Sequence, residues 1–152
     1  MSIFDGQLNI EAAVASGIEA VTKRELIKLG YSPSGANYGR IRFEGDFKDV
    51  MRANVFLRTA NRVRIVLGSF KAETFDELFE GISSIRWQDA LPRDARIVVD
   101  AKSQKSKLFA LRSIQSISKK AIVCAMQRGY SCKTLPESGT AYNLEVAIFD
   151  DI

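Results

Sequence analysis

The chain has 152 residues, of which 46% are hydrophobic and 26% charged, so its length and composition suit one sizeable core or two small ones. It contains no histidine, which removes the commonest general base and the commonest metal ligand. The longest apolar run, residues 121–126, is too short for a membrane span, and the N-terminus lacks a signal-peptide pattern, so we expect a cytoplasmic protein without membrane contact.

The positive charge is concentrated in one segment. Residues 1–90 carry twelve basic and twelve acidic side chains, residues 91–133 carry ten and two, and residues 134–152 carry none and four. The stretch 101–136 contains no Asp or Glu at all. Surfaces normally mix both signs, so the pattern indicates a binding surface for a polyanion. The alternative is an ordinary solvated helix with its loop.

The first seventy residues follow the order strand, helix, strand, strand, helix, strand. We expect these elements in residues 8–14, 16–30, two extended segments within 31–44, 46–57 and 62–70. Ser16 and Glu19 have the spacing of a capping box, and Asp46 is a second N-cap candidate. This order is the split βαβ arrangement called ferredoxin-like, so residues 1–70 are predicted to form one domain.

A second domain, residues 71–152, is predicted to be an α/β unit, which makes the whole chain α+β. Thr74 with Glu77 begins a helix, residues 96–101 form a strand, Ser113 caps a helix that ends near Arg128, and residues 142–149 form a last strand. The core face of the long helix is expected to comprise Ile114, Ile117, Ala121, Cys124 and Ala125, with Ser116, Lys119, Lys120 and Gln127 pointing away. Val123 is apolar on this polar side.

Motifs for catalysis are absent from the sequence. There is no Gly-rich dinucleotide loop, no P-loop and no nucleophile elbow. Cys124 and Cys132, eight residues apart, match neither a zinc site nor a redox CxxC motif, and Cys124 is interpreted as a small core residue. The lone Trp87 is interpreted as a packing residue. We therefore predict no catalytic residue and no metal site in these residues.

The strongest candidate site is the basic segment between residues 102 and 133. Its predicted contacts are Lys102, Lys105, Lys107, Arg112, Ser116, Lys119, Lys120, Arg128 and Lys133. Lysines, hydroxyl donors and the start of a helix at Ser113 suit phosphate groups, but they carry no code for bases. The segment also lacks interleaved aromatic residues, so it favours recognition of RNA by shape.

Several stretches of the sequence are similar to one known family. "GIEAVTKRELIKLGY", "KSQKSKLFALRSIQSISKKAI" and "YNLEVAIFDD" resemble the N-terminal ferredoxin-like and THUMP domains of bacterial 23S ribosomal RNA guanine-N2-methyltransferases. The resemblance implies an RNA-binding THUMP domain in residues 71–152 and a separate catalytic domain that binds S-adenosylmethionine. It also implies that a last strand follows Ile152, so we expect the THUMP domain to be incomplete at its C-terminus, without cofactor or activity of its own.

Two further expectations follow. The edge of strand 142–149 has no predicted partner, so self-association through it is expected. The function also has alternatives: the same two domains occur in transfer RNA modifying enzymes such as thiouridine synthetases and methyltransferases. A basic module that docks an acidic protein would show the same charge pattern, and a small acylphosphatase-like enzyme would share the ferredoxin-like half.

Overall fold

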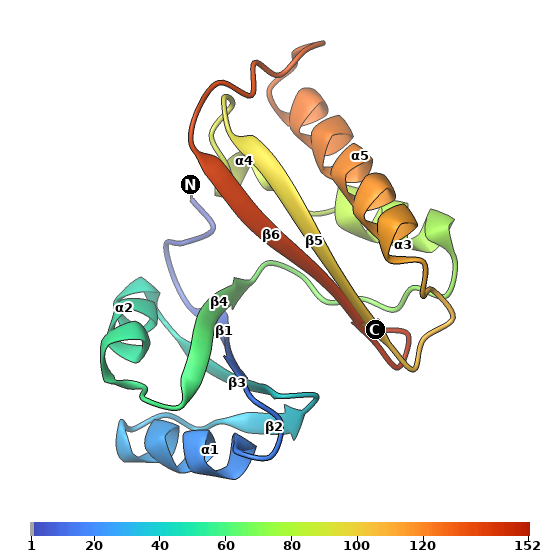
Figure 1. The fold of residues 1–152 in the computed structure, drawn as a ribbon. Coiled ribbons are helices and arrows are strands. Elements are labelled where there is room, and N and C mark those ends of the chain that lie inside the picture. The colour runs from blue at the N-terminus through green and yellow to red at the C-terminus, as the bar shows by residue number, and fades with distance from the viewer. Residues whose placement is uncertain (1) are drawn as a thin grey trace. The chain divides into compact units, whose positions relative to one another are not determined.

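The computed structural model describes residues 2–152, and these divide into two compact units. The first unit ends at Leu67, and the second runs from Gly68 to Ile152. Each unit has its own sheet and its own helices (Figure 1), which confirms the mixed α+β class. None of the helices in the described chain has the length and apolar character needed to cross a bilayer.

The first unit has the expected βαββαβ order. Its elements are β1 (Leu8–Val14), α1 (Glu19–Lys28), β2 (Ser34–Asn37), β3 (Arg40–Gly45), α2 (Phe47–Phe56) and β4 (Ala60–Val66). The strands form one antiparallel sheet in the order β2-β3-β1-β4. The two central strands, β1 and β3, therefore come from distant parts of the unit; α1 connects β1 to β2, and α2 connects β3 to β4.

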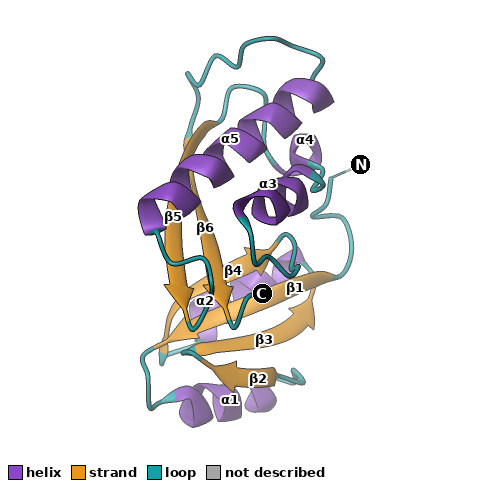
Figure 2. Cartoon of the chain, turned by 90° about the vertical axis from the view of Figure 1, so that its right-hand side faces the viewer, coloured by secondary structure: helices purple, strands orange, loops and turns teal. Residues whose placement is uncertain are grey.

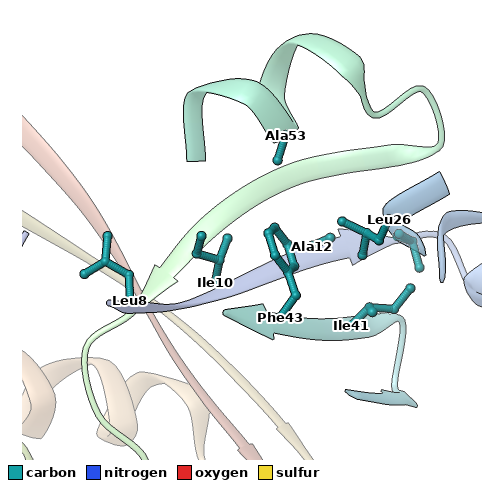
Figure 3. Packing of buried hydrophobic residues seen from close by; sticks show 8 residues of the cluster. Leu8, Ile10, Ala12, Leu26, Ile41, Phe43 and Ala53 are labelled. Atoms are coloured by element: carbon teal, nitrogen blue, oxygen red, sulfur yellow. The ribbon is translucent and has the colours of Figure 1, made fainter. Parts of the chain in front are cut away.

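Strand alternation gives this sheet two different faces. On one face Ile10 and Phe43 are buried and pack against Leu26 of α1 and Ala53 of α2 (Figure 3). Burial of each large aliphatic or aromatic side chain contributes about 1.5–3 kcal/mol, so this cluster holds both helices on the same side of the sheet. The intervening residues point to the opposite face, which no helix of this unit covers.

The two helices of this unit begin in different ways. Asp46 caps α2 as predicted: its carboxylate accepts the N–H of Asp49 at 3.0 Å, and Asp49 accepts the N–H of Asp46 at 2.8 Å. The capping box expected at Ser16 is wrong, because α1 begins three residues later, after Ile18. The Glu19 carboxylate instead accepts the N–H of Gly17 at 2.8 Å and so fixes the turn before the helix.

The second unit packs three helices on a two-stranded parallel sheet. Its elements are α3 (Phe75–Ser83), α4 (Trp87–Ala90), β5 (Arg96–Gln104), α5 (Leu111–Gly129) and β6 (Ala141–Phe149). The strands are aligned from Arg96 opposite Ala141 to Gln104 opposite Phe149. Parallel neighbours need a long crossover, and α5 supplies it while packing on β5, α3 and α4 (Figure 2).

Two boundaries and one short helix in this unit differ from the prediction in ways that affect the basic segment or Trp87. β5 continues to Gln104, so part of the expected basic loop is strand. α5 begins at Leu111 after Ala110, which offers no side-chain cap, so the interpretation of Ser113 as the N-cap is wrong. The short α4 was not predicted, although Trp87 within it is buried and donates its indole N–H to the carbonyl of Ile82 at 2.8 Å. The packing role expected of this tryptophan is thereby confirmed.

The buried face of α5 is rotated from the expected one. Its buried residues are Ile114, Ser118, Ala121, Ile122, Ala125 and Met126. Cys124 is exposed, so its interpretation as a core residue is wrong. The helix contacts α3 and α4 as well as β5, and a stripe that meets three elements is broader than the single face that the hydrophobic pattern indicates.

The free edge of β6 predicts self-association. Within residues 2–152 β6 pairs only with β5, and an open strand edge is a template for pairing with another chain. We expect sedimentation velocity to show an average mass that rises with protein concentration. The exposed substitution Asn143→Lys is expected to suppress this rise, because a charge on an edge strand disfavours pairing. A sedimentation coefficient that stays constant across the concentration range would rule out the edge as a contact.

Candidate nucleic-acid interface

A shallow groove of about 610 Å³ lies between α5 and β5. It is lined by Val99, Arg112, Gln115, Ser116, Lys119, Lys120 and Val123. Four of these residues belong to the predicted site, and all four come from α5. The structure therefore brings together the part of the prediction that was placed on the long helix.

The spacing along α5 explains how the groove forms. Residues three and four apart share one side of a helix, so Ser116, Lys119 and Val123 follow one another along it. Val123, which interrupted the polar side of the predicted helix, is half-buried and lines the groove. Gln115 also lines it, with its amide 3.5 Å from the Asp100 carboxylate, and the same spacing could have identified it from the sequence.

The groove has a positive rim with few neutralising partners. Arg112 and Lys120 are exposed, and neither forms an ion pair within residues 2–152. Lys119 lies 3.7 Å from the Glu137 carboxylate, and both side chains are more than a third exposed. Exposed pairs of this kind contribute about 0–1 kcal/mol, so Lys119 can exchange this partner for another anion.

The remaining predicted residues lie outside the lining of the groove. The Lys102 ammonium on β5 is 3.3 Å from Glu145, and Lys107 forms an ion pair with Glu73. The Arg128 guanidinium donates to the carbonyl of Ser83 at 2.9 Å. Lys105 lies in the turn after β5 with a φ of 52°, and the carbonyl of Lys133 accepts from Gln127 at 2.8 Å. These five predicted positions are therefore not brought into the groove.

Acidic residues from the end of the chain return to the basic segment. Parallel pairing places β6 beside β5, which brings Glu145 next to Lys102. Glu137 and Asp151 come from the same acidic C-terminal segment; Glu137 lies near Lys119, and Asp151 accepts the backbone N–H of Lys107 at 2.7 Å. The acid-free run is therefore partly neutralised by residues that are distant in sequence, whereas Arg112 and Lys120 on the rim of the groove have no acidic partner in the described chain.

Lys107 is part of an anchor that predicts acid sensitivity. Ion pairs with Lys107 and Lys71 lower the pKa of Glu73 from 4.5 to about 2. A lowered folded-state pKa gives stability that is complete above the unfolded value and is lost as the pH falls from about 4.5 through about 2. Urea unfolding followed by Trp87 fluorescence should show a stability difference between the native chain and Glu73→Gln that disappears over this acidic range.

Glu80 provides the matched control for this anchor. It is exposed in the same unit and makes no ion pair in the described chain, so Glu80→Gln should not reproduce the difference. The effect should also shrink in high salt, because the three charged groups of the anchor are solvent-screened. If the free energy of unfolding of Glu73→Gln differs from that of the native chain by the same amount at every pH down to 2, the ion pairs of Glu73 contribute nothing to stability.

No group of three or more His, Cys, Asp or Glu side chains in residues 2–152 could hold a metal ion. Both cysteines are free thiols, with Cys124 exposed and Cys132 half-buried. The chemistry that the described residues offer at the groove is thus anion binding by cations, a hydroxyl and an amide.

Comparison with known proteins assigns a family to both units. Residues 9–64 match the RlmL ferredoxin-like domain, and residues 72–152 match the THUMP domain. YpsC of Bacillus subtilis, which carries the name of an RNA methyltransferase, is 41% identical over 92% of this chain. The ribosomal RNA large subunit methyltransferase K/L of Marinomonas is 23% identical over 90% of it. The chain spans 37% and 20% of the length of these two relatives.

Solved structures agree with this assignment. A protein of Listeria monocytogenes described as a predicted N6-adenine-specific DNA methylase is 44% identical, with a TM-score of 0.90 over 96% of this chain and 38% of its own. SMU.472, described as a methyltransferase and solved with SAH, is 40% identical, with a TM-score of 0.87 over 95% of this chain and 39% of its own. The family match over residues 72–152 covers more than half of the sequence, so this chain belongs to the THUMP domain family, with an RlmL ferredoxin-like domain before it.

Proposed function

We propose that this chain is the RNA-recognition part of an S-adenosylmethionine-dependent ribosomal RNA guanine-N2-methyltransferase that acts in the cytoplasm. The observation that carries the proposal is the groove on α5, where Arg112 and Lys120 are exposed without an acidic partner in the described chain. The names of the relatives, which include an RNA methyltransferase and large-subunit ribosomal RNA methyltransferases, support RNA as the polyanion and 23S ribosomal RNA as the substrate.

The chemistry of the groove supports contact with the RNA backbone. Arginine and lysine bind phosphate oxygens, and Ser116 adds a short hydroxyl donor. Val99 and Val123 give an apolar surface between the charges, and the Ser116 hydroxyl and the Gln115 amide are the groups of the lining that both donate and accept. The surface therefore positions RNA by its phosphates, and it carries few groups that could distinguish one base from another.

Titration of a fluorescein-labelled RNA hairpin with the chain tests this proposal. Fluorescence anisotropy at several salt concentrations should give a log K that falls linearly with log salt, because bound phosphates release counterions. About four to six phosphate contacts correspond to a slope of roughly −3 to −5. A DNA hairpin of the same sequence and a polyglutamate of equal charge serve as competitors.

Each competitor addresses one rival function. RNA should bind more tightly than DNA if the 2′-hydroxyl or the A-form backbone contributes, whereas equal binding would favour the DNA methylase description that the Listeria protein carries. Displacement of RNA by polyglutamate at equal charge would favour docking of an acidic protein. Competition by transfer RNA but not by 23S ribosomal RNA fragments would favour a transfer RNA modifying enzyme.

The proposal places the cofactor outside these residues. SMU.472 was solved with SAH, and this chain covers 39% of that protein. The sequence contains no Gly-rich cofactor loop and no Asn-Pro-Pro run, so we expect no specific binding of S-adenosylmethionine by residues 1–152. Isothermal titration calorimetry at millimolar cofactor checks this expectation. A saturable heat with a stoichiometry near one would contradict it.

A further inference from the structure

The helix-free face of the sheet in the first unit carries an ordered group of arginines. The register of β3, β1 and β4 aligns two rows of side chains on this face: Arg42, Glu11 and Arg64 in one row, and Arg40, Ala13 and Arg62 in the other. Each row thus has an arginine on both sides of β1. Neighbouring strands lie about 4.8 Å apart, so the arginines of one row are separated by roughly 10 Å at the backbone.

The sequence alone conceals this group, because residues 1–90 have equal numbers of acidic and basic side chains. Alternation along the strands sorts these charges by face. Four arginines share the helix-free face with two acids of the same strands, Glu11 and Glu44, which leaves a formal charge of +2. Arg42 and Arg62 are exposed, whereas Arg40 and Arg64 are half-buried. Glu44 lies at the end of the group, where it accepts a hydrogen bond from Gln7 at 2.8 Å.

Glu11 pairs with two of the four arginines. Its side chain is 6% exposed, and its two carboxylate oxygens lie 2.7 Å from the Arg40 guanidinium and 3.5 Å from that of Arg42. The Arg42 side chain is nevertheless 51% exposed, and Arg62 is exposed as well. A guanidinium that is already fixed by a carboxylate loses less rotamer freedom when it binds a second anion.

We propose that this arginine face is a second RNA-phosphate contact, through Arg42 and Arg62, in addition to the groove on α5. The proposal rests on the proposed RNA-binding function of the chain. The planar donors of arginine match phosphate oxygens in pairs, and guanidinium planes also stack on unpaired bases. All four cations of the face are arginines and its neutral members include no aromatic residue, so the contact tolerates any sequence and favours phosphate over base recognition.

The double variant Arg42→Gln/Arg62→Gln tests the arginine face with the same labelled RNA. Loss of two phosphate contacts should flatten the salt slope by about 1.4–1.8 and weaken binding about tenfold near 0.1 M salt. The matched control is Arg24→Gln/Lys28→Gln, which removes two exposed charges from α1 on the other side of the same sheet. The control should bind like the native chain, because the effect depends on position and not on net charge.

The outcomes separate this proposal from the one on which it rests. If Lys119→Ala/Lys120→Ala weakens binding while the arginine variant leaves affinity and slope unchanged, the groove binds RNA and the arginine face does not. If the native chain shows no salt-dependent RNA binding, both proposals are overturned. If polyglutamate displaces RNA from the native chain but not from the arginine variant, the face binds an acidic polypeptide and its assignment to RNA is overturned.

Folding of the arginine variant is checked by its circular dichroism spectrum. Arg62→Gln alone is the second test, because Arg62 is exposed and forms no ion pair in residues 2–152. This single variant should flatten the slope by about 0.7–0.9 and weaken binding about threefold near 0.1 M salt. A folded Arg62→Gln protein with the native slope would overturn the contact at this position.

Discussion

Replacement of both Lys119 and Lys120 by alanine is expected to weaken RNA binding about tenfold or more near 0.1 M salt and to flatten the salt slope by about 1.4–1.8. Both side chains line the groove, both are exposed, and neither belongs to the buried face of α5. Phosphate contacts position nucleic acid without reading it, so the loss should be similar for RNAs of different sequence. Anisotropy titrations at four or more salt concentrations measure affinity and slope together.

The control for this variant is chosen from the structure. Lys28 and Lys48 are exposed on α1 and α2 of the first unit, so their double replacement by alanine removes equal charge far from the groove residues in sequence. Glu25 and Asp49 of the same unit are unsuitable as controls, because the Glu25 carboxylate accepts from the Thr59 hydroxyl at 2.7 Å and the Asp49 carboxylate accepts the backbone N–H of Asp46 in the capping box of α2. If the folded Lys119→Ala/Lys120→Ala protein binds RNA with native affinity at low and high salt, the groove is an ordinary solvated surface and does not contact RNA.

Local features that depend on a few neighbouring residues were predictable. The strand at Leu8–Val14 has the expected bounds, and Asp46 and Thr74 accept the backbone N–H three residues later as N-caps do. Asp49 shows how such a cap is reinforced: its hydrogen bonds from the Asp46 backbone and from the Tyr31 hydroxyl hold its pKa below the usual value. Sequence patterns report the two N-caps because both partners lie within one turn of the chain, whereas the Tyr31 contact spans eighteen residues.

Features set by several packed elements were not predictable. The hydrophobic pattern of α5 placed Cys124 in the core, whereas Ser118 is buried and Cys124 is exposed. The hydroxyl of Ser118 has no hydrogen-bond partner in the described chain, so polarity alone argues against its burial. Only the packing of α3 and α4 on the same helix explains why this residue is inside.

The charge of a surface also depends on residues that are distant in sequence. The acid-free run marks a basic segment in the sequence, but the acids that pair with Lys102 and Lys107 lie 43 and 34 residues away. The arginine face is the opposite case, because strand register collects positive charge in a region where the composition is neutral. Strand pairing therefore determines the charge of the arginine face more than local composition does.

Replacement of Glu11 by alanine is expected to lower the free energy of unfolding of the first unit by about 3 kcal/mol. Glu11 and Arg40 have side chains that are 6% and 12% exposed, and removal of one partner leaves the other charge nearly buried without compensation. Breaking a buried ion pair in this way costs about 3–5 kcal/mol, and the residual exposure of Arg40 places the expected loss at the lower end. Urea unfolding followed by far-ultraviolet circular dichroism measures the loss.

Trp87 makes this test specific to one unit. It is the only tryptophan of the chain and lies in the second unit, so its fluorescence follows that unit alone. In Glu11→Ala the urea midpoint of the fluorescence transition should equal that of the native chain. The circular dichroism transition should show an additional phase at lower urea, which reports unfolding of the first unit. Glu44→Ala, which removes an exposed carboxylate from the same sheet face, should change stability by at most about 0.5 kcal/mol. If the first unit of Glu11→Ala unfolds at the same urea midpoint as the native chain, the Glu11 carboxylate does not stabilise the positions of Arg40 and Arg42.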